Sequence, residues 1–252
     1  MDSPRIIILN GWAASPNAWS LCEFMRHESP NGRRPALYSY VEQLDGLHEQ
    51  EFDRGGRFVV IGWSMGGSSA LRLAIRNPEK IAGLVLVAAT PRMMEEAESG
   101  WVGMSPRRLE VLRRGLELTH GQGLFGPPEG KPNPYMVDDD VNLERGLKYL
   151  RETDLRADLE RTFRTGCGFP VHIFQSDRDG IVRSSNAHYL SSIFTGAHLT
   201  MVEGTEHALP ICIPDAIDMA VYQCGRHIAN QCSLAEGTNA RQLKSRIEFI
   251  KE

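Results

Sequence analysis

The sequence predicts an α/β fold in which a mostly parallel central sheet is flanked by helices. Short runs rich in β-branched residues alternate along the chain with segments of helical spacing. These runs are continuously apolar, which is typical of strands that are buried on both faces. The chain has 252 residues, enough for one large domain of this class with a substantial core.

The alternation predicts the elements one by one. Strands are expected at residues 5–9, 36–41, 57–62, 81–89, 170–176 and 198–204. Helical spacing falls between or after them, at residues 68–76, 184–194 and 214–229. Strands that alternate with helices are typical of parallel sheets, because a parallel pair needs a crossover connection.

The interval from residue 91 to residue 168 interrupts the alternation. Two charged helical segments, residues 105–118 and 142–163, surround a Pro/Gly-rich loop at residues 123–134, and no run there reads as a strand. We expect a helical lid at residues 91–168, inserted into a core formed by residues 1–90 and 169–229. Residues 230–252 are polar and are expected to form a C-terminal tail or an extra helix.

Composition excludes several classes of protein. The formal net charge of -4 argues against nucleic-acid binding, which needs a net or clustered positive surface. The five cysteines lack C-x-x-C spacing, so neither a disulfide framework nor a zinc site is indicated. No apolar run is long enough to span a membrane, and the N-terminus lacks the pattern of a signal peptide. We therefore expect a cytoplasmic protein. No ligand-spaced His, Cys or Asp cluster and no Gly-rich phosphate loop is apparent, so neither a metal nor an organic cofactor is expected.

A serine flanked by glycines stands where the third expected strand meets a helix. Gly62, Ser64 and Gly66 form the pattern G-x-S-x-G within "GWSMGG". In a strand-turn-helix elbow the serine sits in a strained backbone conformation at the carboxyl end of a strand, where neighbouring side chains would clash. Ser64 is thus the candidate nucleophile, and its chemistry requires a base and a carboxylate that orients the base.

In elbows of this kind the acid and then the histidine follow the serine along the chain. The strand after the lid ends in "SDRDGIV", which offers Asp177 and Asp179. Asp179 is favoured because a small-residue turn and an apolar anchor follow it, whereas Asp177 is suited to a cap or to an ion pair with Arg178. Of the eight histidines, only His207 lies in the loop after the last expected strand.

Hydrolysis through a serine also needs two backbone N–H groups that stabilise the oxyanion. One is expected from Met65, the residue after the nucleophile. The other is expected from the loop after the first strand, "LNGWAASPNAW", at Trp12. The simpler interpretation of Trp12 and Trp63 is that they are core aromatic residues, and the two roles are compatible.

The quoted motifs resemble the α/β-hydrolase superfamily and, more narrowly, its pimeloyl-acyl carrier protein methyl ester esterases, which act in biotin synthesis. The similarity extends over residues 6–228. Its marks are the tryptophan-bearing first loop, the elbow, "YLRETDLRADL" at the lid exit, "DGIV" at the acid and "EHALPICIP" at the histidine. The elbow is shared by many esterases, whereas the first loop combined with "GWS" and "TDLR" is more particular.

The resemblance implies a triad of Ser64, Asp179 and His207 and an oxyanion hole at Trp12 and Met65. It also implies a partner and substrate, an acyl carrier protein that bears a methyl-capped dicarboxylic acyl chain. The chain departs from the family at Asn10, where histidine usually precedes the glycine. That departure concerns the packing of the first loop more than the chemistry, because the oxyanion donors are backbone groups.

Basic residues in the expected lid offer a surface for an acidic carrier protein. They are Arg107, Arg108, Arg113, Arg114, Arg145, Lys148 and Arg151. Complementary charge favours such docking, and a solvated helix face with local ion pairs is the alternative.

Three functions therefore remain open from the sequence. The first is the pimeloyl-thioester methyl esterase. The second is a broad-specificity small-ester carboxylesterase, or a menaquinone-pathway lyase of the same fold, which would share the triad and differ in pocket and lid. The third is a non-catalytic binding protein on the hydrolase fold. Haloalkane dehalogenase chemistry is disfavoured, because it places an aspartate where Ser64 stands.

Overall fold

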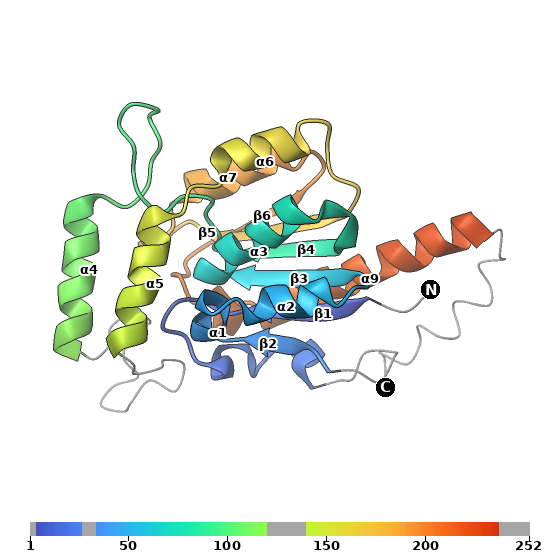
Figure 1. Cartoon of the computed structure of the whole chain (residues 1–252), viewed down its shortest axis with the longest axis horizontal. Coiled ribbons are helices and arrows are strands. Elements are labelled where there is room, and N and C mark those ends of the chain that lie inside the picture. The colour runs from blue at the N-terminus through green and yellow to red at the C-terminus, as the bar shows by residue number, and fades with distance from the viewer. Residues whose placement is uncertain (1–3, 27–33, 120–139, 237–252) are drawn as a thin grey trace.

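A computed structural model describes residues 4–26, 34–119 and 140–236 of the chain (Figure 1). Its described part contains a six-stranded sheet with the order β2-β1-β3-β4-β5-β6. Every neighbouring pair in this sheet is parallel. The predicted α/β fold with a parallel central sheet is confirmed.

Each expected strand is present, with small differences at the ends. The strands are β1 (Arg5–Leu9), β2 (Ala36–Tyr38), β3 (Phe58–Trp63), β4 (Ile81–Val87), β5 (Val171–Ser176) and β6 (His198–Val202). The prediction that β2 continues to residue 41 is wrong. Ser39 instead caps helix α1 (Tyr40–Leu44): its hydroxyl accepts from the N–H of Glu42, whose carboxylate accepts from the N–H of Ser39. This capping box ends the strand and starts the helix.

Burial of the strands depends on their place in the sheet. β3, β4 and β5 are buried along their whole length, as predicted. The same expectation is wrong for the two edge strands, since β2 is only half-buried and β6 exposes His198 and Thr200. A strand at the edge of a sheet has a neighbour on one side only, and the covering helices reach it less completely.

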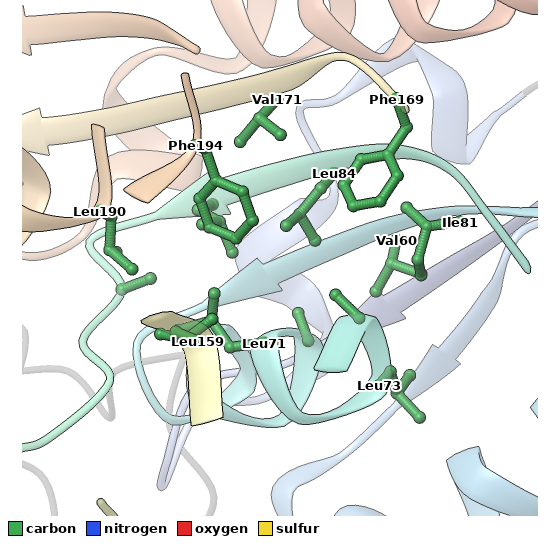
Figure 2. Close-up of a cluster of buried hydrophobic side chains, with 14 of the residues drawn as sticks. Val60, Leu71, Leu73, Ile81, Leu84, Leu159, Phe169, Val171, Leu190 and Phe194 are labelled. Atoms are coloured by element: carbon green, nitrogen blue, oxygen red, sulfur yellow. The ribbon is translucent and has the colours of Figure 1, made fainter. Parts of the chain in front are cut away.

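Two layers of helices cover the sheet. One face packs against α2 (Leu47–Asp53), α3 (Met65–Arg76), α6 (Arg156–Phe163) and α7 (Ser184–Ile193). Figure 2 shows part of this cluster, in which Leu71, Leu159 and Leu190 meet side chains of the strands. The other face packs against η1 (Pro16–Trp19), α8 (Leu209–Cys212) and α9 (Pro214–Glu236). Two further short turns are η2 (Glu23–Met25) and η3 (Pro78–Lys80).

The segment between β4 and β5 is helical in its described part. It contains α4 (Pro106–Thr119), α5 (Asp140–Glu152) and α6, with isolated bridges but no strand among the residues described there. The second expected helical segment is divided into α5 and α6 at residues 153–155. The expected Pro/Gly-rich loop at residues 123–134 lies outside the described residues. α4 and α5 lie side by side beyond one end of the sheet (Figure 1).

The last described helix, α9, runs to Glu236 and therefore passes the expected domain end at residue 229. The later part of the expected tail, residues 237–252, lies outside the described residues. Among the helices that are described, none is both long enough and apolar enough to cross a membrane.

Candidate active site

Ser64 lies at the turn between β3 and α3. Its backbone has φ 56° and ψ -117°, a conformation that a residue with a Cβ rarely adopts. The turn is held by the N–H of Ser64, which donates to the carbonyl of Val87 at 2.9 Å, and by the N–H of Gly67, which donates to the carbonyl of Ser64 at 2.9 Å. The strained turn lifts the hydroxyl beyond the carboxyl edge of the sheet.

The glycines around Ser64 are required by close packing. A Cβ at Gly66 would lie 1.9 Å from the carbonyl oxygen of Leu9, and one at Gly62 would lie 2.4 Å from the carbonyl oxygen of Gly66. No side chain tolerates such distances, so the turn can approach β1 only with glycine at these positions. The G-x-S-x-G spacing is thus the sequence signature of a close contact between α3 and the sheet.

The structure brings Ser64, His207 and Asp179 into one hydrogen-bonded relay. His207 Nε2 lies 2.8 Å from Ser64 Oγ, and His207 Nδ1 lies 2.8 Å from Asp179 Oδ2. An ionised carboxylate can only accept, so Nδ1 carries the proton and Nε2 is left to accept the hydroxyl proton of Ser64. This arrangement is suited to general-base activation of a serine.

Asp179 is fixed in one orientation by the turn that follows it. Its Oδ1 accepts from the N–H groups of Ile181 and Val182 at 2.8 and 2.9 Å. Burial disfavours the charge of this carboxyl, but His207 and the two backbone donors outweigh burial and lower the pKa of Asp179. Asp179 is therefore held ionised in a site from which water is largely excluded.

Asp177, the alternative acid, points to a different group. Its Oδ1 accepts from the N–H of Gly204 at 3.0 Å, which ties the end of β5 to the loop after β6. The sequence suggested a cap or an ion pair with Arg178 for this residue, and the contact seen is a hydrogen bond to a loop N–H. It takes the carboxylate to the loop and not to His207.

Trp12 and Met65 belong to two separate segments next to the serine. Met65 is the first residue of α3, and the first N–H groups of a helix have no partner within it. Trp12 lies in a turn closed by the N–H of Ala14, which donates to the carbonyl of Gly11. Trp12 and Gly11 line the same pocket as Ser64, so both expected oxyanion donors belong to segments beside the nucleophile.

A pocket of about 440 Å³, open solvent at its mouth included, lies over Ser64 and His207. Its remaining lining is apolar and comes in large part from the segment between β4 and β5: Met93, Met104, Leu109, Leu112, Leu147 and Leu150. An apolar lining with a few polar groups at one end is typical of sites that bind small organic molecules. No group of three or more His, Cys, Asp or Glu side chains is arranged to hold a metal ion within the part of the chain described.

The seven basic residues expected for docking lie on α4 and α5, but several are engaged. Arg113 and Arg114 pair with Glu110 on the same helix, which lowers the pKa of Glu110 to about 2. Arg145 pairs with Asp45 at 2.7 Å. Arg108 donates to the carbonyl of Gly180 at 2.6 Å. The others, Arg107, Lys148 and Arg151, are exposed, with no ion pair recorded to any residue of the described ranges.

Asn10, the departure from the resembled family, holds the first loop together. Its Nδ2 donates to the carbonyl of Ala14 at 2.8 Å, and its Oδ1 accepts from the indole N–H of Trp19 at 3.0 Å. Asn10 is fully buried. These bonds satisfy the amide within the first loop itself.

Two supporting groups were not anticipated. Gln175 donates from Nε2 to Asp179 Oδ2 at 3.2 Å and to the carbonyl of Val182 at 3.1 Å. Trp63 donates from its indole to the carbonyl of His207 at 3.1 Å. A polar residue at the buried end of β5 was the available signal for Gln175, whereas the Trp63 contact joins segments far apart in sequence.

The chain is similar to known hydrolases. A family model described as "Alpha/beta hydrolase family" matches residues 6–212. The pimeloyl-[acyl-carrier protein] methyl ester esterase of Nitrosomonas europaea is 28% identical over 239 residues, covering 85% of this chain and 92% of the relative. The protein of the same name from Nitrosospira multiformis is 26% identical over 249 residues, covering 85% and 91%. These matches confirm the resemblance drawn from the motifs.

Solved structures agree on the fold. An esterase from Exiguobacterium antarcticum superimposes with a TM-score of 0.70 at 17% identity, covering 89% of this chain and 92% of that one. An enol-lactonase from Burkholderia xenovorans superimposes with a TM-score of 0.64 at 16% identity, covering 89% and 92%. At such identities the likeness bears on architecture and not on substrate.

Proposed function

The chain belongs to the alpha/beta hydrolase family, and we propose that it is a serine carboxylesterase that cleaves the methyl ester of pimeloyl-acyl carrier protein. The products would be pimeloyl-acyl carrier protein and methanol. The relatives named for this activity support the substrate. The single observation that carries the proposal is the relay from Asp179 through His207 to Ser64, of which His207 and Ser64 line an apolar pocket.

In the proposed mechanism Ser64 is the nucleophile and His207 the base. His207 Nε2 takes the hydroxyl proton while Ser64 Oγ attacks the ester carbonyl, and Asp179 stabilises the imidazolium that forms. The N–H groups of Trp12 and Met65 donate to the oxyanion of the tetrahedral intermediate. Donors held in place before the reaction stabilise developing charge without reorganisation.

The intermediate collapses when His207 returns its proton to the methoxide oxygen, so that methanol leaves and an acyl-Ser64 ester remains. A water molecule, deprotonated by the same imidazole, then attacks the acyl carbonyl. Collapse of the second intermediate restores the hydroxyl of Ser64 and releases the carboxylic acid. The apolar lining suits the methylene chain of the substrate, since it removes apolar surface from water.

We propose further that the acidic carrier protein docks on α4 and α5. Within the cluster, Arg107, Lys148 and Arg151 are the stronger contributors, because Arg113, Arg114 and Arg145 already pair with carboxylates of this chain. Charge complementarity would act mainly on the rate of association. The cytoplasmic location expected from the sequence stays a prediction.

The test compares wild type with Ser64→Ala on two substrates, pimeloyl-acyl carrier protein methyl ester and p-nitrophenyl butyrate. We expect the wild type to turn over the carrier substrate and the variant to lose about a thousandfold or more in kcat on both. Turnover of the small ester alone would leave a broad-specificity carboxylesterase. Absence of serine-dependent turnover on both would leave the binding protein.

Docking is tested by charge reversal of Arg107, Lys148 and Arg151 together. We expect kcat/KM to fall for the carrier substrate and to stay unchanged for p-nitrophenyl butyrate. Arg54→Glu is the control for a change of surface charge, because Arg54 is also exposed but lies at the end of α2, where it pairs with Glu51. Equal effects of both changes on the carrier substrate would remove the docking proposal and leave the esterase intact.

A further inference from the structure

The side chain of Trp12 is fastened to helix α5. Its indole N–H donates to the carbonyl of Leu143 at 2.9 Å in a buried contact. One turn further along, Gly146 makes room for the indole: a Cβ there would lie 2.2 Å from Trp12 Cδ1 and 2.5 Å from Nε1. Residues three apart lie on the same face of a helix. The indole is therefore seated in a notch formed by one face of α5.

Gly146 contradicts the local preference of its own helix. Glycine in the interior of a helix is less favourable than alanine. Here the glycine is buried, and the volume that a methyl group would take is filled by the indole of Trp12. The glycine is therefore explained by the packing of Trp12 against α5, because the helical backbone at this position does not itself require a glycine.

Trp12 also carries a proposed oxyanion donor, its backbone N–H. The loop of Trp12 is held on the core side by Asn10, which binds the carbonyl of Ala14, and by Gln43, which donates to the carbonyl of Asn10 at 2.9 Å. Ala13, beside Trp12, has φ 59°, a conformation unfavourable for alanine. On the far side the loop is held by the indole contact with α5.

Helix α5 is itself anchored to the core. Arg145 pairs with Asp45 at the end of α1, and the hydroxyl of Tyr149 lies 3.4 Å from Ser69 Oγ on α3. Arg72 of α3 lies over the ring of Tyr149, 5.3 Å from its centroid. Because α5 is fixed to the core at several points, it in turn fixes the position of the Trp12 indole.

We propose that the Trp12 side chain, seated on Gly146, is a positioning group that sets the Trp12 N–H for the oxyanion, so that the seating of α5 controls the chemical step. This inference rests on the proposed function, in which that N–H stabilises the intermediate. Displacement of α5 moves the indole and with it the donor. Oxyanion donors act only over a narrow range of distance, so a small displacement lowers kcat more than it raises KM.

The experiment is a double-mutant cycle of Gly146→Ala and Trp12→Ala, read with p-nitrophenyl butyrate. We expect Gly146→Ala alone to lower kcat by about tenfold to a hundredfold, the range typical of a displacement of a catalytic group by about 1 Å. In the Trp12→Ala background the indole is absent, the clash disappears, and the same substitution should change kcat by less than about twofold. Affinity for a trifluoromethyl alkyl ketone, which forms a tetrahedral adduct on an activated serine, should follow kcat.

Gly115→Ala in α4 is the matched control, since a Cβ at Gly115 would meet no atom of the described residues within 4 Å. We expect its kcat to equal that of the wild type. If Gly146→Ala fails to fold, as judged by thermal denaturation, Trp12→Phe decides. It removes the indole donor to Leu143 without adding volume to the notch, and unchanged kcat in that variant would overturn the inference.

These outcomes distinguish the positioning role of Trp12 from the esterase function on which it rests. Equal losses from Gly146→Ala in both backgrounds, or a rise in KM with unchanged kcat, would overturn the positioning role while the esterase stands. A wild type without serine-dependent turnover would overturn both. Non-additive kcat values with matching ketone affinities support the role, because a purely structural contact would change stability without following the strength of oxyanion binding.

Discussion

Asp179 accepts hydrogen bonds from two backbone N–H groups, from Gln175 and from His207. Its Oδ1 is held by the backbone and its Oδ2 is directed at the imidazole, so the two oxygens have separate tasks. Such a carboxylate fixes both the tautomer and the orientation of the histidine. A carboxylate two residues earlier, Asp177, is bound instead to the N–H of Gly204.

We predict that Asp179→Asn lowers kcat on p-nitrophenyl butyrate by about three to four orders of magnitude, because an amide in place of the carboxylate favours the wrong tautomer of His207. Asp177→Asn is the control. It keeps an oxygen that can accept from Gly204, and its kcat should stay within about threefold of wild type. Steady-state kinetics of both variants decide between the two aspartates, and a larger loss at Asp177 would reverse the assignment.

At the scale of elements, residues 153–156 hold together the two ends of the segment between β4 and β5. The N–H of Leu155 donates to the carbonyl of Pro91 at 3.0 Å. Arg156 binds Asp154 and Glu96 at 2.8 and 2.7 Å and lies 5.1 Å from the centroid of the Trp101 ring. The pairing lowers the pKa of Asp154. The "TDLR" motif is thus the point where the segment between β4 and β5 is fastened at its two ends by hydrogen bonds and ion pairs.

We predict that Arg156→Lys lowers the free energy of unfolding by about 1 kcal/mol at low salt, since a lysine cannot make the forked contacts of a guanidinium. The loss should shrink as salt is added, because these partly exposed charges are screened. Urea denaturation measures both effects. Arg161→Lys, at an exposed pair with Asp158 on the same helix, should change stability by no more than about 0.5 kcal/mol. Equal losses of unfolding free energy in the two variants would show that Arg156 contributes no more to stability than an exposed ion pair does.

Two histidines outside the site affect the stability of the whole molecule. His48 on α2 and His172 on β5 are buried. Burial, followed by the positive charges of Arg72 and Arg76 against an opposing effect of Glu49, lowers the pKa of His48 to about 4. Burial and the neighbouring His198 lower the pKa of His172 to about 4. Both side chains are neutral in the folded protein at pH values where they are protonated in the unfolded chain.

A histidine whose pKa is depressed on folding stabilises the folded state only while it stays neutral. The unfolded chain binds more protons between pH 6.5 and about 4, so the free energy of unfolding must fall as pH is lowered through this window. We predict a flatter dependence in the double variant His48→Gln/His172→Gln, measured by urea denaturation at several pH values. The same slope in variant and wild type would show that other groups dominate.

Local patterns were sufficient for much of the fold. The apolar runs marked all six strands of the described sheet, because burial on both faces leaves a continuous apolar sequence. Helix α1 was missed since five residues are too few to show helical periodicity, although Ser39 and Glu42 carried a capping signal. The exposed edges at β2 and β6 were missed because exposure depends on which strand lies outermost.

The candidate triad was accessible from the sequence for a related reason. The glycines around Ser64 reflect a local close approach, and in a parallel sheet the loops after β3, β5 and β6 all leave at the carboxyl edge. Their order along the chain therefore brought Ser64, Asp179 and His207 together before any distance was known. What the residue pattern determined was the class of fold, the elbow and the sequence of chemical groups.

The supports of that site depended on the tertiary structure. Trp12 on Gly146, Asn10 on the indole of Trp19, and Arg108 on the carbonyl of Gly180 each join an element to a partner set by packing. Most of the expected basic cluster proved to be engaged within the chain for the same reason. Such contacts leave no periodic trace in the sequence, because they depend on how helices and loops are placed in three dimensions and not on the local preferences of the backbone.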